Sequence, residues 1–267
     1  MKKKTRAILS LVICLVLGAL RAADLCLLSD PATGFVRVGE AWFRYAAVAA
    51  AAAALFVLSR AASVSPEALR RPKRALGLAM LLTAALMLET GLSSWMVLQR
   101  DSFSTLRGAL LLLLSGLWFA VFGVRALFEP ARRPAPAALG LAALAAPIWV
   151  AVERFAVRPS SLARTGHVLQ VLSVLAALCF LAALLKVFFL PDAPLGRSLA
   201  FTGMLAFLLC TCIELPQTAI SFACGASTLL DLALSGCWGA VGLCGLVSAL
   251  YTAGRDRAAL PPEPQDR

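Results

Sequence analysis

Long hydrophobic stretches alternate with short polar segments along the whole chain. Each stretch is close to the roughly 20 residues that an α-helix needs to cross a bilayer. Lipid offers no hydrogen bonds to an open strand, so helices are expected. The pattern predicts an all-α fold, a polytopic integral membrane bundle of about eight transmembrane helices. The expected spans are 7–28, 41–59, 75–98, 105–128, 135–157, 166–190, 198–222 and 227–252.

Composition supports a membrane protein. Hydrophobic residues make up 61% of the chain and charged residues 15%, whereas soluble domains are about 45 to 50% apolar and about 25% charged. We expect a single transmembrane domain over 1–254 and, because 255–267 is rich in proline and polar residues, a disordered cytoplasmic tail. The net charge of +11 comes from short clusters between apolar stretches. Membrane topology explains these clusters better than a nucleic-acid partner does. The apolar composition predicts contact with a lipid bilayer.

The distribution of basic residues predicts the orientation. With eight spans, 17 of the 25 Lys and Arg residues fall on the side that holds both termini, and 8 fall on the other side. The positive-inside rule then places both termini in the cytoplasm and the protein in the cell membrane. The opening "MKKKTRAILSLVICLVLGALRAAD" resembles a signal peptide, but Arg21 interrupts the place where a cleavage site would be expected. We interpret it as an uncleaved first helix.

Three weak matches indicate an internal duplication. "LLSGLWFAVFG" at 113–123 resembles "ALSGCWGAVGL" at 233–243, Glu89 precedes Glu214 by 125 residues, and "ATGFV" at 32–36 aligns with "RTGHV" at 164–168. Real duplication would give two parallel four-helix repeats, 1–130 and 131–254, related by an axis along the membrane normal, with a candidate site between them. Coincidence among Leu, Ala and Gly explains the matches equally well, so both interpretations stay open.

Glu89 and Glu214 are the leading candidates for a functional site. Each lies in the outer half of an apolar stretch, Glu89 roughly 22 Å along its helix from the cytoplasmic end at 1.5 Å per residue. An acid there costs about 2.5 to 3.5 kcal/mol on insertion scales, so both should face the bundle, a partner or water. Pro216 should free the carbonyl of Cys212 and kink the helix beside Glu214. The structural alternative is that both acids bind an arginine such as Arg107 or Arg44.

Further polar residues gather at the predicted outer ends of the spans. Asp231 should lie about one turn inside the last span, Glu153 and Arg154 close the fifth, and His167 opens the sixth. A polar outward-facing vestibule would explain them, and so would interfacial capping, which we favour for Arg154 and for the pair Arg21 and Asp24. The substrate-binding or coupling residues proposed from the sequence are Glu89, Glu214, Asp231, Arg107, Glu153 and His167.

The sequence gives no sign of a cofactor or a metal. His167 is the single histidine, which excludes bis-histidine haem and HExxH zinc chemistry. Cys210 and Cys212 would point about 200° apart on a regular helix and could not bind one ion. Cys26 and Cys224 are the one plausible disulfide pair. No nucleotide, dinucleotide or nucleophile-elbow motif occurs.

Small residues predict close helix contacts, which argue against a wide permanent pore. The last span carries Gly236, Gly239, Gly242 and Gly245, and the second span carries "AAVAAAAAALF". Small side chains let helix backbones approach each other in lipid, so both spans are expected to be tightly packed central helices.

These features favour a protein that binds or transports, by secondary transport, a small solute or lipid-like molecule through an outward-facing polar cavity. A first alternative is a membrane-embedded enzyme acting on lipid or prenyl headgroups, for which Asp24, the candidate acids and Arg107 would have to converge. A second is a non-catalytic assembly or sensory subunit with a membrane-protein partner or as a homo-oligomer. Catalysis is the less favoured of these functions, and no catalytic residue is proposed.

Overall fold

The computed structural model describes residues 3–30, 35–60, 74–97, 103–128, 138–157, 164–189 and 196–254. These residues are almost all helical, and eight helical runs are long and apolar enough to cross a membrane. The protein is therefore a multi-pass helical membrane protein, as the hydrophobic pattern predicts. The expected tail, 255–267, lies outside the described residues.

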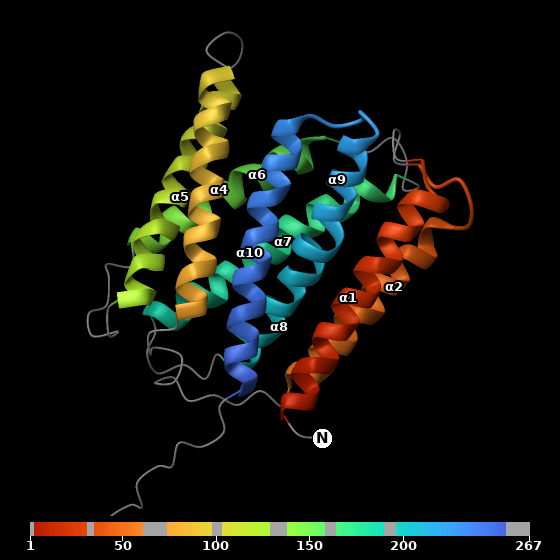
Figure 1. Cartoon of the computed structure of the whole chain (residues 1–267), viewed down its shortest axis with the longest axis horizontal. Coiled ribbons are helices and arrows are strands. Elements are labelled where there is room, and N and C mark those ends of the chain that lie inside the picture. The colour runs from red at the N-terminus through yellow and green to blue at the C-terminus, as the bar shows by residue number, and fades with distance from the viewer. Residues whose placement is uncertain are drawn as a thin grey trace, which may run out of the picture.

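The bounds of the helices agree closely with the apolar stretches. They are α1 (Lys3–Leu27), α2 (Ala41–Ser59), α4 (Arg74–Val97), α5 (Phe103–Phe128), α6 (Ala138–Ala156), α7 (Thr165–Phe189), α8 (Gly196–Ala206), the π-helical segment η1 (Phe207–Glu214), α9 (Leu215–Ala223) and α10 (Leu229–Gly254). The run α8–η1–α9 forms one span. The start of α1 and the end of α10 lie at the same end of the bundle (Figure 1), and we call the opposite end the outer end.

Three spans form the centre of the bundle. The α8–η1–α9 run, α10 and α7 are the most buried. The alanine-rich α2 is the least buried, so the expectation that it is a central helix is wrong. The hairpin α1–α2 packs on α8, η1 and α9, and the hairpin α4–α5 packs on α10 and α6. The two hairpins of the predicted first half therefore lie on opposite sides of the centre (Figure 1).

Glycines make the closest contact between the central helices. A Cβ on Gly203 would lie 2.5 Å from the carbonyl oxygen of Gly245, and one on Gly245 would lie equally close to that of Gly203. Gly239 and Gly242 also face close neighbours, whereas a Cβ on Gly236 would meet nothing within 4 Å. The prediction of close contacts along α10 is thus confirmed at three of its four glycines.

The helix before Pro216 has a π-helical hydrogen-bond pattern. Residues Phe207–Glu214 are π-helical, and the N–H of Leu215 bonds to the carbonyl of Cys210, five residues back. The change of hydrogen-bond pattern therefore extends over the whole preceding segment, and the kink at Pro216 stays a prediction. The carbonyl oxygen of Cys212 faces α1, where a Cβ on Gly18 would be 2.8 Å from it. Helix α1 can approach η1 only because residue 18 has no side chain.

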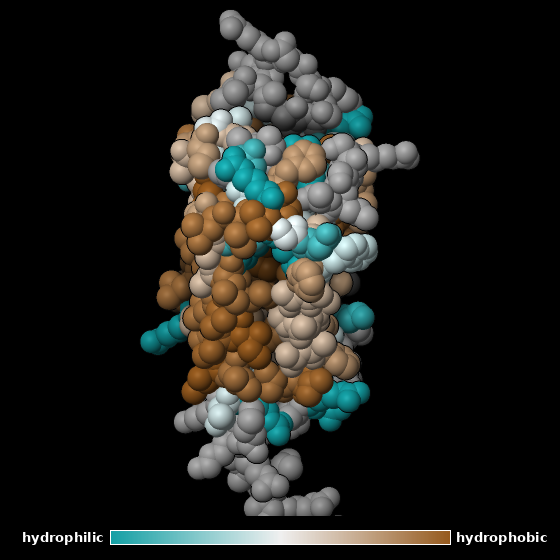
Figure 2. Space-filling model, turned by 90° about the vertical axis from the view of Figure 1, so that its right-hand side faces the viewer, coloured by the Kyte–Doolittle hydropathy of each residue, from teal (hydrophilic) through white to brown (hydrophobic). Residues whose placement is uncertain are grey.

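The surface has the layering expected of a membrane protein. On the side turned to the viewer in Figure 2, apolar residues cover the middle of the molecule, and hydrophilic residues gather toward both ends. The internal repeat stays a prediction. The two matching serines have different surroundings, since Ser115 bonds to the backbone of Ala142 and Ala146 in α6, whereas the buried hydroxyl of Ser235 has no partner among the described residues.

Candidate functional site

Glu214, the last residue of η1, forms a buried ion pair. Its side chain is 1% exposed, and its Oε1 lies 2.5 Å from Nη2 of Arg154, near the end of α6. Its other carboxylate oxygen accepts a hydrogen bond from the hydroxyl of Ser173 in α7. The structural alternative, an acid bound to an arginine, thus describes Glu214 correctly, but the arginine is Arg154 rather than Arg107 or Arg44.

Helix α7 supplies the other partners of this pair. Arg154 Nη1 donates to the carbonyl of Gln170 and lies 3.3 Å from the hydroxyl of Ser173. The thiol of Cys210, one turn before Glu214, donates to the carbonyl of Ser173 at 3.2 Å. A buried ion pair is tolerated when further hydrogen bonds satisfy its charged groups. Three helical spans therefore meet at Glu214.

His167 closes the end of α6 beside this pair. Its Nε2 lies 3.1 Å from the carbonyl oxygen of Arg154 and 2.9 Å from that of Val157. Carbonyl oxygens only accept hydrogen bonds, so Nε2 carries a proton in this arrangement. The last carbonyls of a helix have no partner within it. His167 thus caps the end of α6 and positions Arg154 through its backbone carbonyl.

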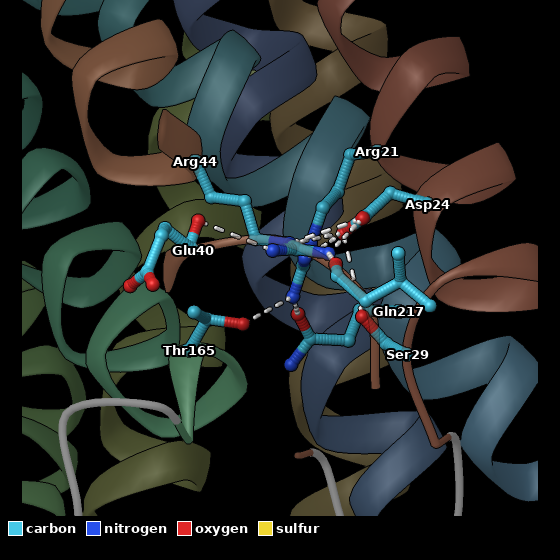
Figure 3. Close-up of polar contacts among 8 residues, drawn as sticks. Arg21, Asp24, Ser29, Glu40, Arg44, Thr165 and Gln217 are labelled. Atoms are coloured by element: carbon cyan, nitrogen blue, oxygen red, sulfur yellow. Dashed lines mark hydrogen bonds and ion pairs between the residues drawn. The ribbon is translucent and has the colours of Figure 1, made fainter. Parts of the chain in front are cut away.

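A second polar cluster ties the α1–α2 hairpin to the centre (Figure 3). The carboxylate of Asp24 lies 2.5 Å from the guanidinium of Arg21, three residues earlier, and 2.5 Å from that of Arg44 in α2. Arg44 also donates to the carbonyls of Val38 and Glu40. One carboxylate therefore holds together two arginines from neighbouring helices.

Arg21 connects this cluster to α7 and α9. Its Nη2 donates to the hydroxyl of Thr165 at 3.1 Å and to the side-chain oxygen of Gln217 at 3.2 Å (Figure 3). Its side chain is only 8% exposed, and Nε alone lacks a partner among the described residues. The predicted i, i+3 pair of Arg21 and Asp24 is confirmed, but its contacts with two other spans were not foreseen.

The two clusters share α7 and the η1–α9 run and form one polar layer. Gln217 follows Glu214 by less than one helical turn, and both are buried. Thr165 and Ser173, also buried, lie on α7. We call the set Arg21, Asp24, Arg44, Arg154, Thr165, Gln170, Ser173, Glu214 and Gln217 the outer polar layer. It lies near the outer end of the bundle, where the sequence predicts polar residues to gather.

The other candidate residues lie at other positions in the fold. Asp231 is exposed and caps the start of α10 by accepting hydrogen bonds from the N–H and the hydroxyl of Thr228, at 2.9 and 2.7 Å. Glu153 and Arg107 are exposed near helix ends. Glu89 is exposed on α4 and makes no hydrogen bond or ion pair among the described residues. The structure thus does not bring Glu89 and Glu214 together.

The cysteines do not form a metal or disulfide site in the described part of the chain. All eight are free, and Cys26 and Cys224 are both exposed. Cys210 faces α7, whereas Cys212 lies beside α1, so the prediction that they point apart is confirmed. No group of three or more His, Cys, Asp or Glu residues among the described positions could hold a metal ion.

Sequence reasoning found Glu214 but missed its setting. The sequence favours an interfacial cap for Arg154, although a charged residue within a span has to find a partner. Ser173, Gln217 and Thr165 gave no separate signal, because hydroxyl and amide side chains are common in membrane helices. Comparisons of the chain with protein-family models, with curated proteins and with solved structures give no match. The function is therefore inferred from the residues themselves.

Proposed function

We propose that the protein binds, and by secondary transport moves, a small solute or a lipid-like molecule at its outer polar layer, with Glu214 as the binding or coupling acid. The buried Arg154–Glu214 pair is the observation that carries this proposal. Apolar residues of similar volume often stabilise a fold as well as a buried ion pair does. Packing alone therefore does not explain why the most buried span carries Glu214, paired with Arg154.

The helix around Glu214 supports the same proposal. The π-helical segment ends at this residue, and Pro216 follows two positions later. Single π-helical turns occur often at functional sites, and interrupted helices in transporters direct backbone groups at a bound solute. The hydroxyl of Ser173 and the carbonyl of Gln170 add hydrogen-bonding groups at the ion pair. A solute with a donor group could compete with Arg154 for the carboxylate and so couple binding to movement of α6 against α9.

The proposed orientation places both termini in the cytoplasm. The outer polar layer then lies in the half of the membrane that faces away from the cytoplasm. The excess of Lys and Arg at the end that holds the termini supports this orientation. A reporter fused after Arg267 tests this orientation, because alkaline phosphatase should be inactive there and green fluorescent protein should fluoresce. The opposite result would reverse the orientation and the side from which a solute enters.

A thermal-shift screen of the purified protein in lipid nanodiscs tests the function. Candidate solutes, lipids and divalent ions are added separately, and a ligand that binds the folded state raises the unfolding temperature. We expect one class of solute or lipid to stabilise the wild type. The double variant Arg154→Met with Glu214→Leu should lose that response while staying folded, because no charge is left unpaired.

Glu89→Gln is the matched control, since it removes an acid from another membrane span outside the outer polar layer. It should respond to the ligand as the wild type does. If the double variant keeps the full response, Glu214 is not the binding acid. If no solute or lipid stabilises the wild type, the binding proposal is wrong. Uptake of the stabilising ligand into proteoliposomes then separates transport from binding alone.

A further inference from the structure

Helix α4 carries an acid, Glu89, among its exposed apolar side chains. Its large exposed side chains are Leu78, Leu82, Leu92, Trp95 and Met96, with Leu78 61% exposed and Met96 74% exposed. Glu89 lies seven residues after Leu82 and seven before Met96, so helical spacing places all three on one side. Other sides of α4 contact its two neighbours, since Thr90 contacts Cys237 of α10 and Gly91 lies against Leu113 of α5. Glu89 is therefore on the face that no described helix covers.

The position of Glu89 along the helix distinguishes it from the other exposed acids. Seven residues separate it from Met96, the end of the span, which is about 10 Å at 1.5 Å per residue. Asp231 lies in the first turn of α10 and Glu153 in the last turn of α6. These two acids can reach the water interface, and Asp231 already has a capping role. Glu89 is the acid that stands within an apolar face.

The residues one turn before and after Glu89 are small. Ala85 and Ser93 are both exposed, and they lie four residues to either side of the acid on the same face. Small residues at this spacing allow two membrane helices to approach closely, and a serine hydroxyl can bond across their interface. We call Leu82, Ala85, Glu89, Leu92, Ser93 and Met96 the Glu89 face.

We infer that the Glu89 face is the docking surface for a transmembrane helix of another membrane protein, one that carries a lysine or arginine at the depth of Glu89. An intramembrane acid normally faces the bundle interior, a cavity or an oppositely charged partner. Within the described residues Glu89 has neither a hydrogen bond nor an ion pair. A basic side chain from outside would supply one, and Ala85 and Ser93 leave room for its helix.

Charge complementarity decides between the two kinds of partner. A second copy of this chain docked through the same face would bring a second Glu89 against the first, and like charges at close range repel. A helix with one basic side chain adds the opposite charge instead. This docking surface shares no residue with the outer polar layer, so its test and the test of solute binding are independent.

Synthetic helices in nanodiscs test this inference. The probes are two 23-residue Leu/Ala peptides that carry an acceptor fluorophore and differ at one position, where one has lysine at the depth of Glu89 and the other leucine. The donor fluorophore is attached enzymatically at the C-terminus of the full-length protein. We expect the lysine peptide to associate about 5- to 30-fold more tightly, which corresponds to the 1 to 2 kcal/mol of an intramembrane polar contact.

Two variants and one control locate the contact. Glu89→Leu should abolish the preference for lysine, and Ser93→Leu should weaken binding of the lysine peptide, because a large side chain keeps the helix away. Glu153→Leu removes an exposed acid near a helix end and should leave the preference unchanged. All three positions are exposed, so the variants should keep the unfolding temperature of the wild type.

Three results would overturn the inference. The lysine and leucine peptides could bind the wild type equally, or the preference for lysine could survive in Glu89→Leu. Alternatively, protein labelled with donor and acceptor could self-associate without any peptide, in a manner that Glu89→Leu abolishes, which would make a second copy the occupant. A lysine preference that is lost only with Glu89 supports the proposed partner.

Discussion

Glu214 and Glu89 are the same residue type in the outer half of two membrane spans, yet their surroundings are opposite. Glu214 is buried where α6, α7 and η1 meet and is paired with Arg154. Glu89 is exposed on α4, on the same side as the exposed Leu82 and Met96. The two acids differ in the side of the helix on which they lie, and both lie in the outer half of a span. An intramembrane acid can therefore hold a bundle together or face outward, and depth alone does not distinguish the two roles.

The largest expected effect comes from removing the buried acid alone. Glu214→Leu should lower the free energy of unfolding by about 3 to 5 kcal/mol, because Arg154 remains as a buried charge without its partner. The measurement is equilibrium unfolding in mixed detergent micelles. Adding Arg154→Met should restore most of the loss, since no charge is then left unpaired. A double variant that is less stable than either single variant would show that the pair is not coupled in this way.

The next effect tests the second cluster of the outer polar layer. Asp24→Asn should lower the free energy of unfolding by about 1.5 to 3 kcal/mol, the range for hydrogen bonds to charged groups, because Arg21 and Arg44 then face each other without a carboxylate. It should also loosen α1 from η1. Mass spectrometry should detect faster alkylation of Cys212, which is 7% exposed beside Gly18. Unchanged alkylation would mean that the cluster does not hold the hairpin.

Two glycines of α10 also have different surroundings, since Gly245 lies against a neighbouring helix and Gly236 does not. Gly245→Ala should lower the free energy of unfolding by about 1 to 3 kcal/mol, the usual range for overpacking, because its methyl group would meet the backbone of Gly203. Gly236→Ala should be neutral or slightly stabilising, because a Cβ there meets nothing within 4 Å. Thermal unfolding of both variants checks the prediction, and similar losses would contradict this packing of α8 on α10.

The smallest expected effect is at the exposed acid. Glu89→Gln should change the free energy of unfolding of the purified protein by less than about 0.5 kcal/mol, as is usual for surface substitutions. The same unfolding assay as for Glu214 makes the two acids directly comparable. A loss of more than about 2 kcal/mol would indicate an intramolecular role for Glu89 and would remove the contrast between the two acids.

The amino-acid sequence by itself determined the class of protein, the number and bounds of the spans, and the outer-half position of Glu89 and Glu214. These follow from physical limits that act along one chain, because the bilayer thickness sets the length of an apolar helix. The glycines of the last span likewise predicted close helix contacts, which occur at Gly239, Gly242 and Gly245. The depth of a residue can be counted along the chain.

Only the tertiary structure decided which side of each helix faces inward and which residues meet. Lipid is as apolar as the interior of the bundle, so the hydrophobic effect does not sort the faces of a membrane helix and leaves little periodicity in its sequence. The pairing of Glu214 with Arg154, 60 residues away, and the bridge from Arg21 to Thr165 and Gln217 depend on how the spans pack. For the same reason, the sequence could place Glu89 at the right depth but not on the outward side of α4.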